Sequence, residues 1–182
     1  SYAKSSDLNR FGGRFKYSKV LNVIDNIDKS ITSNITRVKI RRNLNALINQ
    51  FAQYELCFGN RFNVKPEGLN IKSTGFRIQG QSDTVFITDT PNADKLTGVI
   101  SIVKRDETTG TNIVVVKSAG TVDYVHGEVN LTTINIVSTD KPNNIVEVQA
   151  FPDSNDVIGL QDLYLDFHIP NSTINLVKDT IT

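Results

Sequence analysis

The sequence predicts an α+β protein that is mainly β, with antiparallel strands in a sandwich-like arrangement and a short amphipathic helix near the N-terminus. A clear helical period is found in one place only, directly after a pair of glycines. From Gln53 onward, short runs rich in Val, Ile, Thr and Phe are separated by clusters of Gly, Pro, Asn and Asp, as in antiparallel β proteins. The 182 residues, 38% of them hydrophobic, suffice for a substantial core.

The N-terminal part is predicted to form an extension, a turn and then the helix. We interpret Ser1–Arg10 as the extension and Phe11–Phe15 as the turn, because paired glycines adopt positive φ at little cost. Between Tyr17 and about Lys29, apolar residues recur at helical spacing, which places them on one face. Ser18 is the expected N-cap, since its hydroxyl can accept a hydrogen bond from a free amide of the first turn. The apolar residues of this face are Tyr17, Val20, Leu21, Ile24, Ile27 and Ile31.

A basic strand is predicted after the helix. Beyond Asn34 the hydrophobic period changes to two, so that Val38 and Ile40 alternate with basic side chains. This pattern indicates a strand with one apolar face and one basic face. The segment 43–48 that follows is compatible with either a helix or a strand. The alternating basic residues are Arg37, Lys39 and Arg41.

The remainder of the chain is predicted to consist almost entirely of strands. The clearest pair is Val99–Lys104 with Asn112–Lys117, and the loop around Gly110 is long enough to join them as a hairpin. We expect two units along the chain, an N-terminal extension, helix and basic strand over residues 1–62 and a β-rich domain over residues 63–182. Further strands are predicted near residues 128–132, 134–138, 145–150 and 163–169.

Charge is distributed unevenly along the chain. Through Phe62 there are 11 Lys and Arg against 4 Asp and Glu, or +7; the rest holds 9 against 15, or −6, which gives the net charge of +1. Such a split favours electrostatic steering between subunits, although a basic stripe is also typical of a solvated strand face or of a nucleic-acid site. The predicted protein-interface residues are Arg37, Lys39, Arg41 and Arg42.

No catalytic, cofactor or metal site is predicted. His126 and His168 lack further ligands at the spacing of a zinc site. The acidic run 153–162 departs from a calcium loop, because Ile158 stands where that loop needs glycine. Phosphate-binding, dinucleotide-binding and serine-hydrolase motifs are missing from the sequence. We therefore expect a protein that is not an enzyme and binds no cofactor.

Cysteine content and hydropathy place two further limits. Cys57 is the only cysteine, so no intrachain disulfide is possible, and its apolar strand context predicts a buried structural thiol. No apolar run approaches the roughly 20 residues that a membrane-spanning helix needs, so we expect no membrane partner.

Several motifs taken together resemble the baseplate J-like family, which comprises baseplate wedge proteins of contractile-tailed phages. The similarity covers most of the chain, from about Asp7 to Phe151, and its first block combined with the Gly-Thr-Val-Asp-Tyr block is the most specific part. The matching positions are Phe11 to Phe15, Ser18, Ile24-Asp25, Ser30 to Asn34, the basic Arg37 to Arg42, Phe58 to Asn60, Ile71 to Ser73 with Phe76, and Gly120 to Tyr124 with Gly127.

The resemblance implies a structural role. In that family, copies pair with one another and encircle the central hub, linking the wedges into a ring. It implies that this chain forms a homodimer within such a ring and contacts other baseplate wedge proteins, without nucleic acid or membrane as partners. It also implies a location in the tail baseplate of the virion, after assembly in the host cytoplasm.

A carbohydrate-binding or receptor-binding β module is the alternative function. Such a module needs a concave site with exposed aromatic side chains. The chain has no tryptophan, so tyrosine and phenylalanine would have to supply that site. The tyrosines are Tyr2, Tyr17, Tyr54, Tyr124 and Tyr164.

Overall fold

The computed structural model describes residues 2–161 and 164–178. The chain is mainly β, as predicted, with one α-helix, α1 (Tyr17–Asp25), and short 3-10 turns η1 (Tyr2–Lys4), η2 (Pro142–Asn144) and η3 (Ile169–Asn171). The strands are β1 (Arg14–Phe15), β2 (Ile40–Asn45), β3 (Phe51–Cys57), β4 (Lys72–Ser73), β5 (Phe76–Ile78), β6 (Val85–Pro91), β7 (Thr97–Arg105), β8 (Asn112–Asp123), β9 (Glu128–Thr139), β10 (Ile145–Ala150) and β11 (Val157–Ile158).

Strands β5 to β9 form a five-stranded antiparallel barrel, so the predicted sandwich-like arrangement is wrong. Each strand pairs with the next, and β9 closes the ring by pairing with both β8 and β5. The first residues of β9, Glu128 to Leu131, pair with β8, and Ile136 to Thr139 pair with β5. Alternating apolar residues predict strands with one buried face, which fits a closed sheet as well as two stacked sheets. The sheet closes because β9, with 12 residues, is long enough to pair with β8 through its first residues and with β5 through its last.

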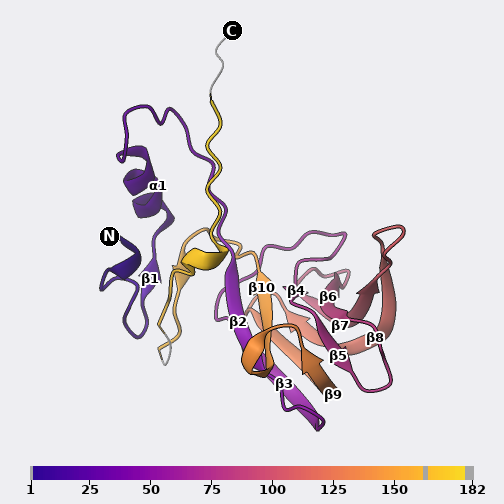
Figure 1. Ribbon diagram of the computed structural model, residues 1–182. Helices are drawn as coiled ribbons and strands as arrows, with labels where there is room; N and C mark the ends of the chain where they lie inside the picture. The colour runs from indigo at the N-terminus through magenta and orange to yellow at the C-terminus, as the bar shows by residue number, and fades with distance from the viewer. Residues whose placement is uncertain (1, 162–163, 179–182) are drawn as a thin grey trace.

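A smaller sheet packs against the barrel. Its strand order is β2-β10-β4, and β3 pairs separately with residues 128–135 of β9 (Figure 1). The Ile87 backbone amide in the barrel donates a 2.8 Å hydrogen bond to the Ser73 hydroxyl in β4, which ties the two sheets together. One hydrophobic cluster includes Leu44 of β2, Val148 of β10 and Ile100 of the barrel. The two sheets therefore share a core.

A buried polar network fixes the barrel at Asp89 of β6. The Asp89 carboxylate accepts hydrogen bonds from the Tyr124 hydroxyl (2.6 Å), the Asn70 amide group (2.8 Å) and the Ile71 backbone N–H (2.7 Å). Burial, reinforced by the Asp89 carboxylate, raises the pKa of Tyr124 well above its usual range. The Tyr124 hydroxyl is therefore a permanent donor, and the network satisfies a carboxylate that is costly to bury unpaired.

Several predicted elements are confirmed. The pair Val99–Lys104 and Asn112–Lys117 forms the hairpin of β7 and β8, and β10 covers the predicted residues 145–150. The strands predicted near 128–132 and 134–138 are one continuous strand, β9. The unit boundary at residue 62 stays a prediction, although β2 and β3 pair with β10 and β9 across it.

Other local predictions are wrong. Helix α1 ends at Asp25 rather than near Lys29, and its N-cap is Lys16, in extended conformation and without a side-chain cap, rather than Ser18. The long final strand predicted over 163–169 is not formed: Tyr164 makes a single bridge to Phe11, and the following residues are irregular or in η3. Residue 163 lies outside the described residues. An alternating pattern makes a strand only where a partner strand is at hand.

Candidate assembly surface

The Gly-Gly turn is held by close backbone packing. Gly12 has a φ of +65°, in the left-handed region, and a Cβ at Gly13 would clash with the carbonyl oxygen of Leu8. The Arg14 N–H donates to the Asp7 carbonyl at 2.9 Å, which closes the turn. Both positions therefore need glycine, Gly12 for its backbone angle and Gly13 for lack of space.

Helix α1 is attached through its first residue rather than by a buried face. The Tyr17 N–H donates a 2.8 Å hydrogen bond to Asp156, and the Tyr17 hydroxyl donates to the Thr36 carbonyl at 2.9 Å. None of the described residues of α1 is buried. The predicted apolar face is present on α1, but its side chains are only partly buried. Its half-buried members are Tyr17, Val20, Leu21, Ile24 and, beyond the end of the helix, Ile31.

Two arms project from the packed sheets. Figure 1 shows α1 with the segment leading to β2, and the C-terminal segment, extending away from the barrel on the same side of β2. We call residues 2–39 the N-terminal arm and residues 164–178 the C-terminal arm. Large apolar side chains on both arms are exposed. They are Phe11, Val23, Ile27, Ile35, Tyr164, Ile169, Ile174, Leu176 and Val177.

The predicted interface residues are divided between two environments. Arg37 and Lys39 are exposed and precede β2, which begins only at Ile40. Lys39 lies over the Phe151 ring, with its Nζ 5.5 Å from the ring centroid, in a cation–π contact. These two side chains are presented to solvent, as the predicted interface requires.

Arg41 and Arg42 lie within β2 and are half-buried. Arg41 Nη1 lies 2.8 Å from Glu147 Oε1, and Lys141 approaches the other oxygen of that carboxylate at 3.6 Å. Arg42 pairs with the buried Val148 across the strands, so it is on the opposite face from Arg41. The four residues thus do not form one basic surface. Arg41 is engaged inside the chain.

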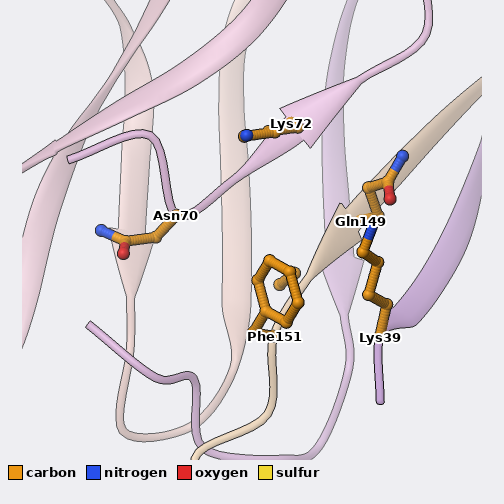
Figure 2. A pocket seen from close by; sticks show the side chains of 6 residues that line it. Lys39, Asn70, Lys72, Gln149 and Phe151 are labelled. Carbon is orange, nitrogen blue, oxygen red and sulfur yellow. The ribbon is translucent and has the colours of Figure 1, made fainter. Parts of the chain in front are cut away.

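A small cavity of about 60 Å³ lies beside Lys39 (Figure 2). Lys39, Lys72 and Gln149 come from three neighbouring segments and approach it together with the Phe151 ring. Its volume suits a water or a single side-chain tip from a partner rather than a sugar or a cofactor.

A larger basic hollow was missed by sequence reasoning. It has a volume of about 540 Å³ and lies between the Gly-Gly turn and the start of α1. The sequence contains an indication of it, since four basic residues fall within ten positions. Their number alone does not show that the turn brings them around one hollow. We call this site the N-terminal hollow. Its lining residues are Asp7, Arg10, Phe11, Gly12, Arg14, Lys16 and Lys19.

Among residues 2–161 and 164–178, no group of three or more His, Cys, Asp or Glu side chains is arranged to hold a metal ion. Within the same described ranges, no helix has both the length and the apolar character needed to cross a bilayer.

Comparison with known families finds a similarity that is confined to the N-terminal arm and the start of β2. Residues 1–43 match a family model described as baseplate structural protein gp6, C-terminal domain III. The match is consistent with a gp6-related baseplate wedge protein and confirms the resemblance inferred from the motifs. No curated protein matches the chain.

The family match supports a function in general terms only. It supports a structural role in the tail baseplate of a virion, in contact with other baseplate components, and it suggests a non-enzymatic role. The matched segment ends within β2, so it comprises the N-terminal arm, the Gly-Gly turn and α1.

Proposed function

We propose that this chain is a wedge subunit of a contractile-tail baseplate, and that it self-associates to link wedges into a ring around the central hub. Assembly into the virion takes place in the host cytoplasm. The observation that carries the proposal is the pair of exposed apolar arms beside a well-packed barrel, one of which coincides with the gp6 family match. Exposed apolar residues gathered on projecting segments are typical of interaction sites.

The C-terminal arm contributes apolar side chains without a fixed surface beneath them. Ile174, Leu176 and Val177 are each more than 85% exposed, and they lie in an irregular segment. An extended segment with such side chains gains free energy by docking on a neighbouring subunit, where backbone groups and apolar side chains both find partners. Self-association through the arms provides such a neighbour.

Arg37 and Lys39 support the proposal as rim charges. Both are exposed at the base of the N-terminal arm. Charges at an interface rim mainly alter the encounter rate and the salt dependence, whereas apolar anchors hold the complex. Arg41 is not a suitable test position, because its reversal to Glu would place two carboxylates together at Glu147.

Sedimentation velocity across a concentration series tests the proposal. Wild-type protein is expected to self-associate, and Leu176→Asp with Val177→Asp is expected to weaken association strongly by charging the C-terminal arm. Arg37→Glu with Lys39→Glu should weaken it at low salt, and less near physiological ionic strength, where the Debye length is about 8 Å.

The matched control is Lys65→Glu with Lys117→Glu, an equal charge change at exposed residues that form no ion pair in the described structure. A wild-type protein that stays monomeric at every concentration would contradict self-association. Equal effects of the test and control variants would assign the salt dependence to net charge alone.

The alternative of a carbohydrate-binding or receptor-binding module receives less support. Tyr124 and Phe76 are buried in the core, so they are not available as stacking platforms. Phe11 and Tyr164 are exposed, but they pair with each other. A glycan array with no binder, alongside self-association in solution, would separate the two functions.

A further inference from the structure

The N-terminal hollow concentrates positive charge in one place. Four basic side chains line it, from Arg10, Arg14, Lys16 and Lys19, and the only acidic lining residue is Asp7. This gives the lining a charge of +3, by subtraction of one carboxylate from four cations. All four basic residues are exposed. A site of this kind attracts anionic groups and holds them close to several cations.

Only one of the four cations has a carboxylate partner in the described structure. Lys19 Nζ lies 2.5 Å from Asp7 Oδ2. This hydrogen bond and the Lys19 charge lower the pKa of Asp7, and the nearby charges of Arg10 and Lys16 lower it further. The positive charges of Arg10, Lys16 and Lys19 therefore act together on this part of the hollow. Arg10, Arg14 and Lys16 are left to contact another molecule.

The backbone around the hollow is held by hydrogen bonds within the chain. One side is the Gly-Gly turn, where the Arg14 N–H donates to the Asp7 carbonyl. Strand β1, which carries Arg14, pairs with β11, and the Lys16 N–H donates a 2.9 Å hydrogen bond to the Tyr2 hydroxyl. A site formed before its ligand arrives loses little conformational entropy on binding.

An exposed aromatic pair stands at the rim. The Phe11 side chain is 71% exposed and meets the Tyr164 ring edge-to-face, with a centroid separation of 6.5 Å. Two large rings that face solvent beside a cationic hollow offer an apolar contact next to the charged one. The pair also joins the two arms at this point, because Phe11 and Tyr164 form a β-bridge.

We infer that the N-terminal hollow is a docking site for an acidic segment of a partner protein, in which carboxylates meet Arg10, Arg14 and Lys16 and an apolar side chain packs on Phe11. The inference rests on the proposed structural function and specifies the chemistry of one partner. Guanidinium groups bind carboxylates through paired N–H donors, so the two arginines favour Glu and Asp side chains.

A nucleic acid is the competing polyanion, and the geometry favours a protein segment. A single-stranded nucleic acid needs a basic groove that follows its backbone for several nucleotides, with successive aromatic platforms. Here the cations gather in one hollow, and the aromatic rings contact each other instead of lining a track.

Fluorescence anisotropy with labelled peptides tests the inference on the full chain. The probe is the peptide Glu-Glu-Phe-Glu-Glu, and its neutral counterpart is Gln-Gln-Phe-Gln-Gln. We expect the acidic probe to bind and the neutral peptide to bind at least tenfold more weakly. Arg10→Gln with Arg14→Gln should weaken binding of the acidic probe at least tenfold, and Phe11→Ser should weaken it severalfold without any change of charge.

Lys65→Gln with Lys117→Gln is the matched control, since it removes the same charge at exposed residues that do not line the hollow and should change binding less than twofold. Thermal unfolding verifies that each variant is folded. Equal losses in the arginine variant and the control, or tighter binding of an oligothymidine of equal charge, would overturn the inference.

The peptide assay and the sedimentation assay report on different properties. A monomeric protein that binds the acidic peptide through Arg10 and Arg14 would overturn the proposed self-association and leave the docking site standing. A self-associating protein whose hollow fails to bind the peptide would do the reverse.

Discussion

The barrel and the arms differ in how far they bury their apolar residues. In the barrel, Ile100 and Val129 are fully buried, and even the polar Asp89 has three hydrogen-bond donors around it. In the arms, α1 contains no buried residue, and the C-terminal arm exposes Ile174 almost completely. The barrel buries most of its large apolar side chains, with Ile113 and Val114 of β8 as exposed exceptions, whereas the arms carry several apolar side chains that the chain itself does not cover.

This difference separates stability from assembly. Burial of apolar area contributes most of the folding free energy, so the barrel sets the global stability. The arms contribute few buried contacts, so they open locally at lower cost and remain free to pack on another molecule. Changes in the two regions should therefore be detected by different measurements.

The largest expected effect comes from placing a charge at matched isoleucines in the two regions. Ile100→Asp would bury a carboxylate in the barrel without a partner and should cost about 4 kcal/mol or more, enough to unfold much of the protein. Ile24→Asp should cost only about 1 kcal/mol, because Ile24 is half-exposed in α1, although a negative charge near the helix C-terminus is also unfavourable.

Urea unfolding of both variants measures the difference. The helical periodicity taken alone predicts a large cost for a charge at Ile24, and the exposure of α1 reduces that expectation. Similar unfolding midpoints for the two variants would mean that α1 is packed as firmly as the barrel.

A smaller and local effect is expected at the Gly-Gly turn. Gly13→Ala would bring a methyl group against the Leu8 carbonyl and should open the turn at a cost of about 2 kcal/mol. Gly12→Ala is the matched control: its Cβ would meet no atom within 4 Å, so it should cost only about 1 kcal/mol, for the left-handed backbone.

Hydrogen exchange gives the measurement for the turn. The Arg14 amide, which bonds to the Asp7 carbonyl, should exchange faster in Gly13→Ala, whereas amides of the barrel such as Ile87 should keep their protection. Loss of protection throughout the barrel in Gly13→Ala would show that the arm and the barrel unfold as one unit.

Sequence reasoning succeeded where the determinants are local. The spacing of apolar residues predicted the start of α1 at Tyr17, and the alternation of Val and Ile predicted the hairpin of β7 and β8. Residue type also marked the Gly-Gly turn, because Gly12 and Gly13 are each required by the backbone around them. These features depend on neighbours within a few positions.

The failures concern contacts between distant residues. Closure of the barrel depends on the pairing of β9 with both β5 and β8, and no period in the sequence encodes it. The Asp89 network joins residues from three segments, so its members were not singled out together. Likewise, the pairing of Arg41 with Glu147, 106 positions away, could not be read from local sequence, and it engages the Arg41 side chain within the chain.

The smallest expected effect is a pH dependence confined to the turn between β8 and β9. There His126 Nδ1 lies 2.8 Å from Asp123 Oδ2, and this hydrogen bond, together with the carboxylate charge, raises the pKa of His126 above its ordinary value of 6.5. A raised pKa in the folded state means that the protonated imidazole stabilises folding below pH 6.5, and that this stabilisation is lost as pH rises through the folded pKa.

Urea midpoints of wild-type protein should therefore fall slightly between about pH 6 and pH 8. His126→Gln should remove that decrease, while the lowered pKa of Asp123 acts only at acidic pH. The effect must be small because the His126 side chain is 70% exposed and solvent screens the pair. Identical pH profiles for the two proteins would mean that the pair contributes nothing to folding. A large difference would place this turn within the cooperative unit of the barrel.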